Sequence, residues 1–149
     1  MSIPIRHFSK RGLTDLIKTL WAGWDYNTPE EHIWLSGDGS YGSHFKEIGK
    51  SYGPFDFAFM ECGQSNDDWH TVHLFPNEAV RAAIDANTKK AMPVHWAGFA
   101  LSYQHTWDQP VEEFVKNATD HKLNYTTPPL GHLFRIDADL QEKWWVPYV

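Results

Sequence analysis

Three residues with metal-binding side chains stand at the ends of segments that read as β-strands. His7 follows IPIR, Asp38 follows HIWLS, and His95 closes AMPVHW. In layered α/β folds, ligands and active groups gather at strand ends. Imidazole and carboxylate together suit zinc, manganese or iron, and two such ions ~3.5–4 Å apart activate a water and clamp a phosphate or carbonyl oxygen. These residues are therefore candidate metal ligands.

Each candidate also has an ordinary structural interpretation. A single His at a strand end is more often a surface or hydrogen-bonded residue, and roughly one in five such residues is expected to be functional. Asp38 lies between two glycines, where Asp is a common turn former that hydrogen-bonds the nearby backbone. Spacing alone does not join the three residues into one site.

The composition sets the class of protein. The 149 residues suit a single domain over 1–149, and the net charge of -6, without a run of Lys or Arg, argues against nucleic-acid binding. Cys62 is the single cysteine, so no intrachain disulfide forms and a reducing compartment is expected. No apolar stretch approaches the ~20 residues of a membrane span, and the first ten residues lack a signal-peptide apolar region. We expect a cytoplasmic protein without a membrane span.

Strand and helix patterns alternate along the chain. Strands are expected over residues 3–6, 18–26, 32–36, 55–60, 90–96 and 132–136, and helices over 44–51, 76–87 and 111–121. A turn at Pro29 joins the second and third strands as a hairpin. The pattern predicts an α/β domain with a mixed sheet, and its tryptophans, Trp21, Trp24, Trp34 and Trp96, are expected in the core.

Four stretches, in order, resemble the carboxy-terminal portion of the metallo-β-lactamase superfamily. They are PIRHFSKRGLTDLIKTLWAGW, WLSGDGSYGSHFKEIGKSYGPFDFAFM, VHLFPNEAV and KKAMPVHWAGFAL, which cover most of residues 4–101. The nearest branch holds lactonase-like hydrolases and N-acylphosphatidylethanolamine-hydrolysing phospholipase D. The resemblance implies half of an αββα sandwich, with helices on one face of the sheet, and a metal-dependent hydrolase of esters, lactones or phosphodiesters.

The resemblance also assigns roles to single residues. It implies that His7 binds one metal, that Asp38 bridges two metals and that His95 binds the second. It places His73, before the helix PNEAV, in the catalytic site, where it holds substrate or assists proton transfer. The implied metal is Zn²⁺, with Mn²⁺ or Fe²⁺ as alternatives.

Two departures from the family pattern bear on substrate preference. The loop that usually reads G-D-T-G-Y is here Gly37-Asp38-Gly39-Ser40-Tyr41, which keeps the Asp and changes its neighbours. The loop over residues 61–71 carries the additional acids Asp67 and Asp68.

The family signature H-x-H-x-D-H does not occur in these residues. The expectation is therefore a truncated hydrolase with an incomplete metal site, inactive alone, whose metal is weakly held or absent. One half of a sandwich exposes the inner face of its sheet, which predicts a homodimer through that face or pairing with a separate amino-terminal half. The alternative is a non-enzymatic truncated paralogue that self-associates or binds a partner.

Overall fold

The strands form one mixed sheet. The computed structural model describes residues 1–7, 13–14, 20–63, 65–98, 100 and 103–148, and the order across its sheet is β1-β2-β3-β4-β5-β6. The first three strands pair antiparallel, which confirms the predicted hairpin, and β3 to β6 pair parallel. The strands are β1 (Ser2–Ile5), β2 (Trp21–Asn27), β3 (His32–Leu35), β4 (Phe57–Glu61), β5 (Lys90–Val94) and β6 (Asn124–Tyr125).

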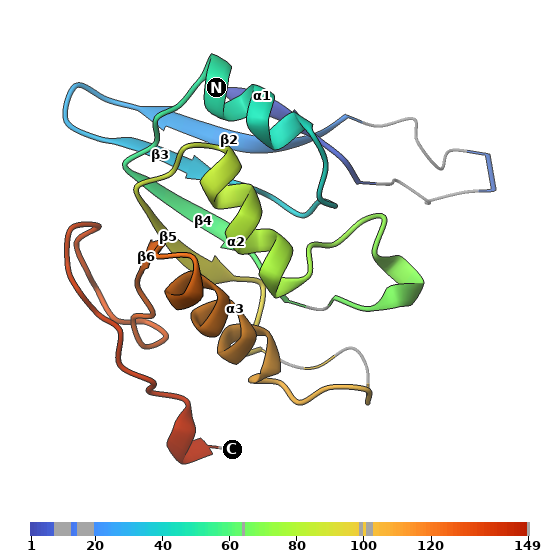
Figure 1. Cartoon of the computed structure of the whole chain (residues 1–149), viewed down its shortest axis with the longest axis vertical. Helices are drawn as coiled ribbons and strands as arrows, with labels where there is room; N and C mark the ends of the chain where they lie inside the picture. The colour runs from blue at the N-terminus through green and yellow to red at the C-terminus, as the bar shows by residue number, and fades with distance from the viewer. Residues whose placement is uncertain (8–12, 15–19, 64, 99, 101–102, 149) are drawn as a thin grey trace.

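Three helices cover one face of this sheet (Figure 1). They are α1 (His44–Ser51), α2 (Pro76–Asp85) and α3 (Gln109–Asp120); short 3-10 helices lie between β4 and α2, at Asp67–Trp69, and after β6, at Val146–Tyr148. Each helix buries apolar residues at helical spacing, as Phe45 and Ile48 do in α1. In α2, Pro76 occupies the first turn, and the Glu78 carboxylate accepts the Phe75 N–H at 3.1 Å. The predicted α/β class is confirmed.

The main core lies between the sheet and the helices. Trp34 of β3 is fully buried and stacks on Phe55 with ring centroids 5.3 Å apart. It also meets Phe45 of α1 at 5.9 Å in an edge contact. These aromatic contacts fix α1 and the β3 end on one another, and the loop that carries Asp38 runs between them.

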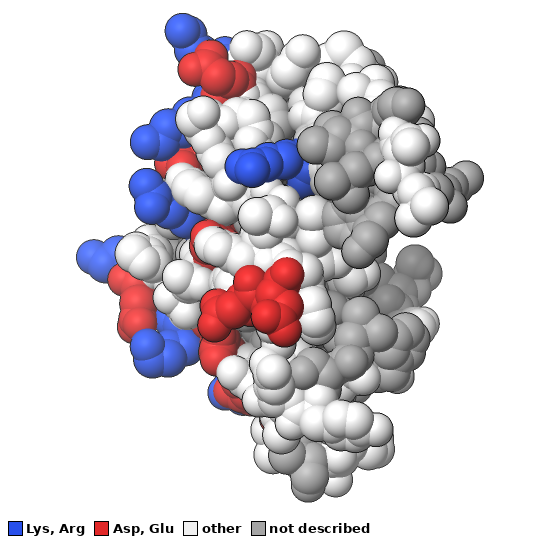
Figure 2. Space-filling model, turned by 90° about the vertical axis from the view of Figure 1, so that its right-hand side faces the viewer, with Lys and Arg blue, Asp and Glu red and all other residues white. Residues whose placement is uncertain are grey.

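The opposite face of the sheet is apolar and only partly covered. The register places Trp24, Leu35, Phe59 and Met92 in one row across four strands. Trp24 is 53% exposed, so its expected place in the core is wrong. In Figure 2 the charged side chains gather on the side of the helices, and the described surface toward the open face shows none. We call this row, with Tyr26 and Ile33 beside it, the open face.

The segment after β6 departs from the sequence prediction. A strand over residues 132–136 was expected, and the structure has loop and turn there, with Leu133 94% exposed. The short strand β6 already pairs with the edge of β5, and Pro128 and Pro129 then end the pairing because proline lacks an N–H. The expected strand over 18–26 begins at Trp21, while residues 18 and 19 lie outside the described residues.

The C-terminal segment is anchored on α3. Trp145 is fully buried, and its indole N–H donates to a carboxylate oxygen of Glu112 at 2.8 Å. Lys143 donates to the other oxygen of the same carboxylate. Trp145 packs with Val111 and Val115 in a second, smaller core. No helix among the described residues is long and apolar enough to cross a membrane.

The contact between α1 and α2 predicts the effect of a single methyl group. A Cβ at Gly49 would lie 2.4 Å from the Asp85 carbonyl oxygen and 2.7 Å from the Ala86 carbonyl carbon, both backbone atoms. We expect Gly49→Ala to lower the free energy of unfolding by about 1–3 kcal/mol, because overpacking exceeds the ~1 kcal/mol gain in helix propensity. Urea unfolding measures the change.

Gly98→Ala is the matched control, because no described atom lies within 4 Å of a Cβ placed there. The control should be as stable as the parent or slightly more so, since Ala restricts the unfolded chain. Equal stability of the two variants would contradict the close approach of α1 and α2.

Candidate metal centre

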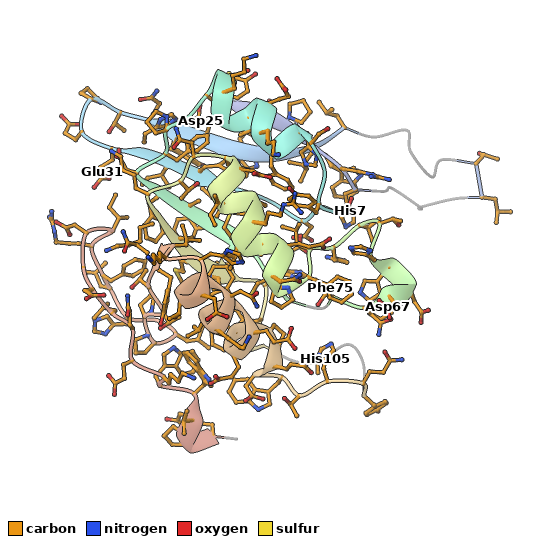
Figure 3. The ribbon with its side chains drawn as sticks, in the orientation of Figure 1. His7, Asp25, Glu31, Asp67, Phe75 and His105 are labelled. Atoms are coloured by element: carbon orange, nitrogen blue, oxygen red, sulfur yellow. The ribbon has the colours of Figure 1, made fainter. Side chains whose placement is uncertain are left out.

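Five side chains with metal-binding groups meet at one edge of the sheet. His7 follows β1, Asp38 follows β3, Glu61 ends β4, and His95 follows β5, while His73 precedes α2. Strands β3, β4 and β5 are parallel, and β1 runs in the same direction because two antiparallel pairings separate it from β3. Their carboxyl ends therefore share one edge, which Figure 3 shows for His7, on the same side as Phe75 at the start of α2.

The side chains form two overlapping groups. Ligand atoms of His7, Asp38 and His73 lie within 4.8 Å of one another, and so do those of Glu61, His73 and His95. His95 links the groups, because its Nε2 lies 3.7 Å from the Asp38 carboxylate and its Nδ1 lies 3.9 Å from that of Glu61. The His73 ring stacks on that of His95 with centroids 5.5 Å apart. The structure thus brings together all four residues singled out in the sequence.

Glu61 was not among the sequence predictions. Its carboxylate is 1% exposed, and one oxygen accepts the Gly39 backbone N–H at 2.7 Å. The other oxygen contacts Nδ1 of His73. Its own backbone N–H donates to the Ser36 hydroxyl at 3.0 Å. The strand-end position that drew attention to Asp38 and His95 applies equally to Glu61, which comes directly after the apolar run FDFAFM, where the sequence reading began a polar loop.

The backbone around His95 is tightly constrained. A Cβ at Gly63 would lie 2.0 Å from the His95 carbonyl oxygen, so only glycine allows the ends of β4 and β5 to approach this closely. His95 itself has a φ of 68°, a left-handed conformation that is uncommon outside glycine. Its Nδ1 lies 3.2 Å from the Gly63 carbonyl oxygen, which leaves Nε2 directed toward Asp38. Backbone geometry and the hydrogen bond together orient this ring.

Glu61 and His73 hold a proton more firmly than either would alone. Burial raises the pKa of the Glu61 carboxyl, against the opposing effect of His73. Burial favours the neutral His73 ring, but the hydrogen bond and charge of Glu61 outweigh it and raise the pKa of His73. Both shifts act in the same sense, so the pair shares a proton to a higher pH than free side chains would.

Other residues considered in the sequence lie outside this cluster. Cys62 is fully buried, and burial raises the pKa of its thiol, which argues against a reactive thiolate. His70, its nearest candidate activator in the sequence, instead pairs with Glu78 at 2.8 Å. Asp67 and Asp68 form the 3-10 turn before His73.

The donor set fits a divalent cation. Imidazole nitrogens and carboxylate oxygens are the ligands that zinc, manganese and iron accept in proteins. Asp38 and His95 are partly exposed, at 45% and 35%, so an ion and a substrate can reach them. Glu61 lies behind them and acts on His73 and on the Asp38 loop.

Both the fold and the amino-acid sequence are similar to those of known proteins. The metallo-β-lactamase fold protein YhfI of Bacillus subtilis aligns with a TM-score of 0.62 and 14% identity, over 90% of this chain and 48% of its own. The family model described as a beta-lactamase superfamily domain matches residues 1–96, and the chain belongs to that superfamily.

Two relatives illustrate the range of lengths in this family. The outer membrane protein RomA of Klebsiella pneumoniae is 41% identical over 74% of this chain and 88% of its own length. N-acyl-phosphatidylethanolamine-hydrolyzing phospholipase D 1 of Caenorhabditis elegans is 27% identical over 89% of this chain and 39% of its own. The chain therefore spans most of RomA but less than half of the worm enzyme.

The Glu61 contact predicts the tautomer of His73 in the metal-free protein. Because Nδ1 faces the carboxylate, we expect the neutral His73 ring to carry its proton on Nδ1 and to leave Nε2 unprotonated. Long-range ¹H–¹⁵N NMR spectra at a pH where the ring is neutral distinguish the two tautomers. In Glu61→Ala the preference should disappear. His70 is the internal control, since its Nε2 faces Glu78 and its tautomer should not change.

A wild-type His73 protonated on Nε2 would contradict this arrangement. If Glu61→Ala does not fold, the wild-type spectrum alone still decides the matter.

Proposed function

We propose that this chain provides one half of the metal centre of a hydrolase that acts on an ester, lactone or phosphodiester. His7, Asp38 and His95 are the residues that would hold the metal. The convergence of these three residues with His73 at one sheet edge is the observation that carries the proposal. The name of the worm relative, an N-acyl-phosphatidylethanolamine-hydrolyzing phospholipase D, supports the phosphodiester class.

The cation and the protein side chains have separate tasks in this proposal. A bound Zn²⁺, Mn²⁺ or Fe²⁺ supplies an acidified water and polarises the substrate oxygen. His73 is the proposed catalytic residue of the chain, because Glu61 fixes one ring nitrogen and leaves the other for substrate or for a proton. Zinc is the expected ion, since imidazole and carboxylate are its common catalytic ligands.

The rest of the ligand set is proposed to come from outside these residues, either from an amino-terminal half or from a second copy of the chain. The open face supports this, because an apolar face with exposed Trp24 and Tyr26 favours association with another sheet. A cytoplasmic location remains a proposal that rests on the single cysteine.

Metal binding tests the proposed ligands directly. We expect the purified chain to bind Zn²⁺ and Asp38→Ala to lose about 100-fold or more in affinity, since even outer-shell changes cost 10- to 100-fold. Elemental analysis and competition with a chromophoric chelator measure this. Asp120→Ala is the control, because Asp120 is exposed at the end of α3 and pairs with Lys116 of the same helix.

Equal zinc affinity in the parent and Asp38→Ala would reject the proposed ligand set. A folded chain that takes up no metal would favour the alternative, a non-enzymatic domain that self-associates or binds a partner through the open face.

Light scattering tests the homodimer. We expect a mass of twice 17.3 kDa at micromolar concentration. Trp24→Lys should give the monomer, because the two-fold axis would bring like charges together on the open face. Ile84→Lys is the matched control, since Ile84 is a comparably exposed apolar residue on α2, at 43% against 53% for Trp24. A parent chain that stays at 17.3 kDa would refute the dimer.

A further inference from the structure

A small apolar pocket shares a wall with the candidate metal centre. Its volume is 140 Å³, and it lies between the end of β5 and the segment after β6. His95 belongs to both, because its Nε2 lies 3.7 Å from the Asp38 carboxylate and the residue also lines the pocket. The other lining residues are mostly apolar: Met92, Pro93, Val94, Trp96, Thr127, Pro128, Leu130 and Trp144.

The lining excludes a charged ligand. Among the described residues, no Lys, Arg, Asp or Glu lines the pocket, and His95 is the one titratable residue of this lining. The Thr127 hydroxyl is already occupied, because it donates to the carbonyl oxygens of Leu140 and Glu142. Burial of an unpaired charge in this pocket would cost free energy, whereas its apolar lining favours the burial of an apolar group. The group that it accepts is therefore neutral and largely apolar.

The two indoles in the lining differ in their hydrogen bonding. The Trp96 N–H donates to the Pro93 carbonyl oxygen at 3.0 Å. The Trp144 N–H is buried and has no hydrogen-bond partner within the described part of the chain. A buried N–H without a partner is uncommon. The Trp144 nitrogen has almost no accessible surface, so both indoles offer a ligand in the pocket only their apolar ring atoms.

The volume sets the length of the apolar group. An engineered apolar cavity of about 150 Å³ holds one benzene molecule. The pocket of 140 Å³ therefore suits about six carbons, well short of a membrane-lipid chain.

We infer that this pocket is the subsite for a short, neutral acyl or alkyl group of the substrate, about six carbons long. The inference rests on the proposed hydrolase function and narrows its substrate class. The subsite places the bond to be broken near His95, because His95 is common to the pocket and to the candidate metal centre.

A chain-length series tests the subsite without relying on activity. Unbranched 1-alkanols from ethanol to 1-octanol serve as probes, and NMR shifts of the Trp144 indole N–H report binding to the full chain. We expect the affinity to rise about fourfold per methylene group. The rise should level off near six carbons. Trp144→Ala removes one apolar wall and should weaken the binding of 1-hexanol, followed through the Trp96 indole N–H.

Two exposed leucines of the same segment provide a matched pair of variants. Leu130 lines the pocket and is 72% exposed, and Leu133 is 94% exposed and does not line it. Leu130→Asp should lower the hexanol affinity by at least about tenfold, because it places a charge in the apolar wall. Leu133→Asp should leave it unchanged. Equal effects of the two variants, or no dependence on chain length, would overturn the subsite.

Zinc uptake, measured on the same samples, separates this inference from the proposed function. Zinc binding together with the chain-length dependence supports both. Zinc binding without that dependence overturns the subsite alone. Alkanol binding by a chain that takes up no zinc overturns the assignment of the pocket to a substrate, and the proposed hydrolase function with it.

Discussion

The candidate metal centre depends on the interactions of one buried carboxylate, that of Glu61. An ionised group in the interior is stable only when hydrogen bonds and opposite charge replace its lost hydration. Here the Gly39 N–H and the His73 ring supply them, and the Ser36 hydroxyl holds the backbone of Glu61 in place. One side chain thus connects the loop after β3, the end of β4 and the approach to α2. Removing any of these partners leaves a polar group of Glu61 without its hydrogen bond. A change in one of the three segments is therefore expected to affect the other two.

Strand direction explains why the candidate ligands meet although they are distant in the sequence. His7 and His95 are separated by 88 positions, yet both follow strands that run the same way. The glycine at position 63 then allows the last step, since it lets the β4 end pass against the His95 carbonyl. The strand directions bring the candidate ligands to one edge of the sheet, and single backbone positions such as Gly63 determine how closely they approach.

Local patterns predicted most of the fold. The helix over 44–51 was predicted with its observed bounds because Phe45 and Ile48 have helical spacing and Gly53-Pro54 ends it. The strand over 132–136 was wrong because alternating apolar residues do not provide a pairing partner, and β6 had taken the free edge of β5. Glu61 was not predicted, because its burial and its two hydrogen bonds depend on residues 22 and 12 positions away in the sequence. A local pattern does not contain such contacts. For the candidate site, residue types and positions at strand ends singled out His7, Asp38 and His95. The family resemblance then suggested that they belong to one metal centre.

The family model ends at residue 96, but one wall of the pocket beside His95 comes from residues 127–144. That wall is held by the buried Trp145 and its bond to Glu112, both of which lie beyond the matched region. The candidate ligands therefore lie within the matched region, whereas part of the surface that would select a substrate lies beyond it. Such a division lets natural variation alter which molecules are accepted while the reactive groups remain as they are. Residues 127–144 are therefore the place to compare when two otherwise similar members of the superfamily accept different substrates.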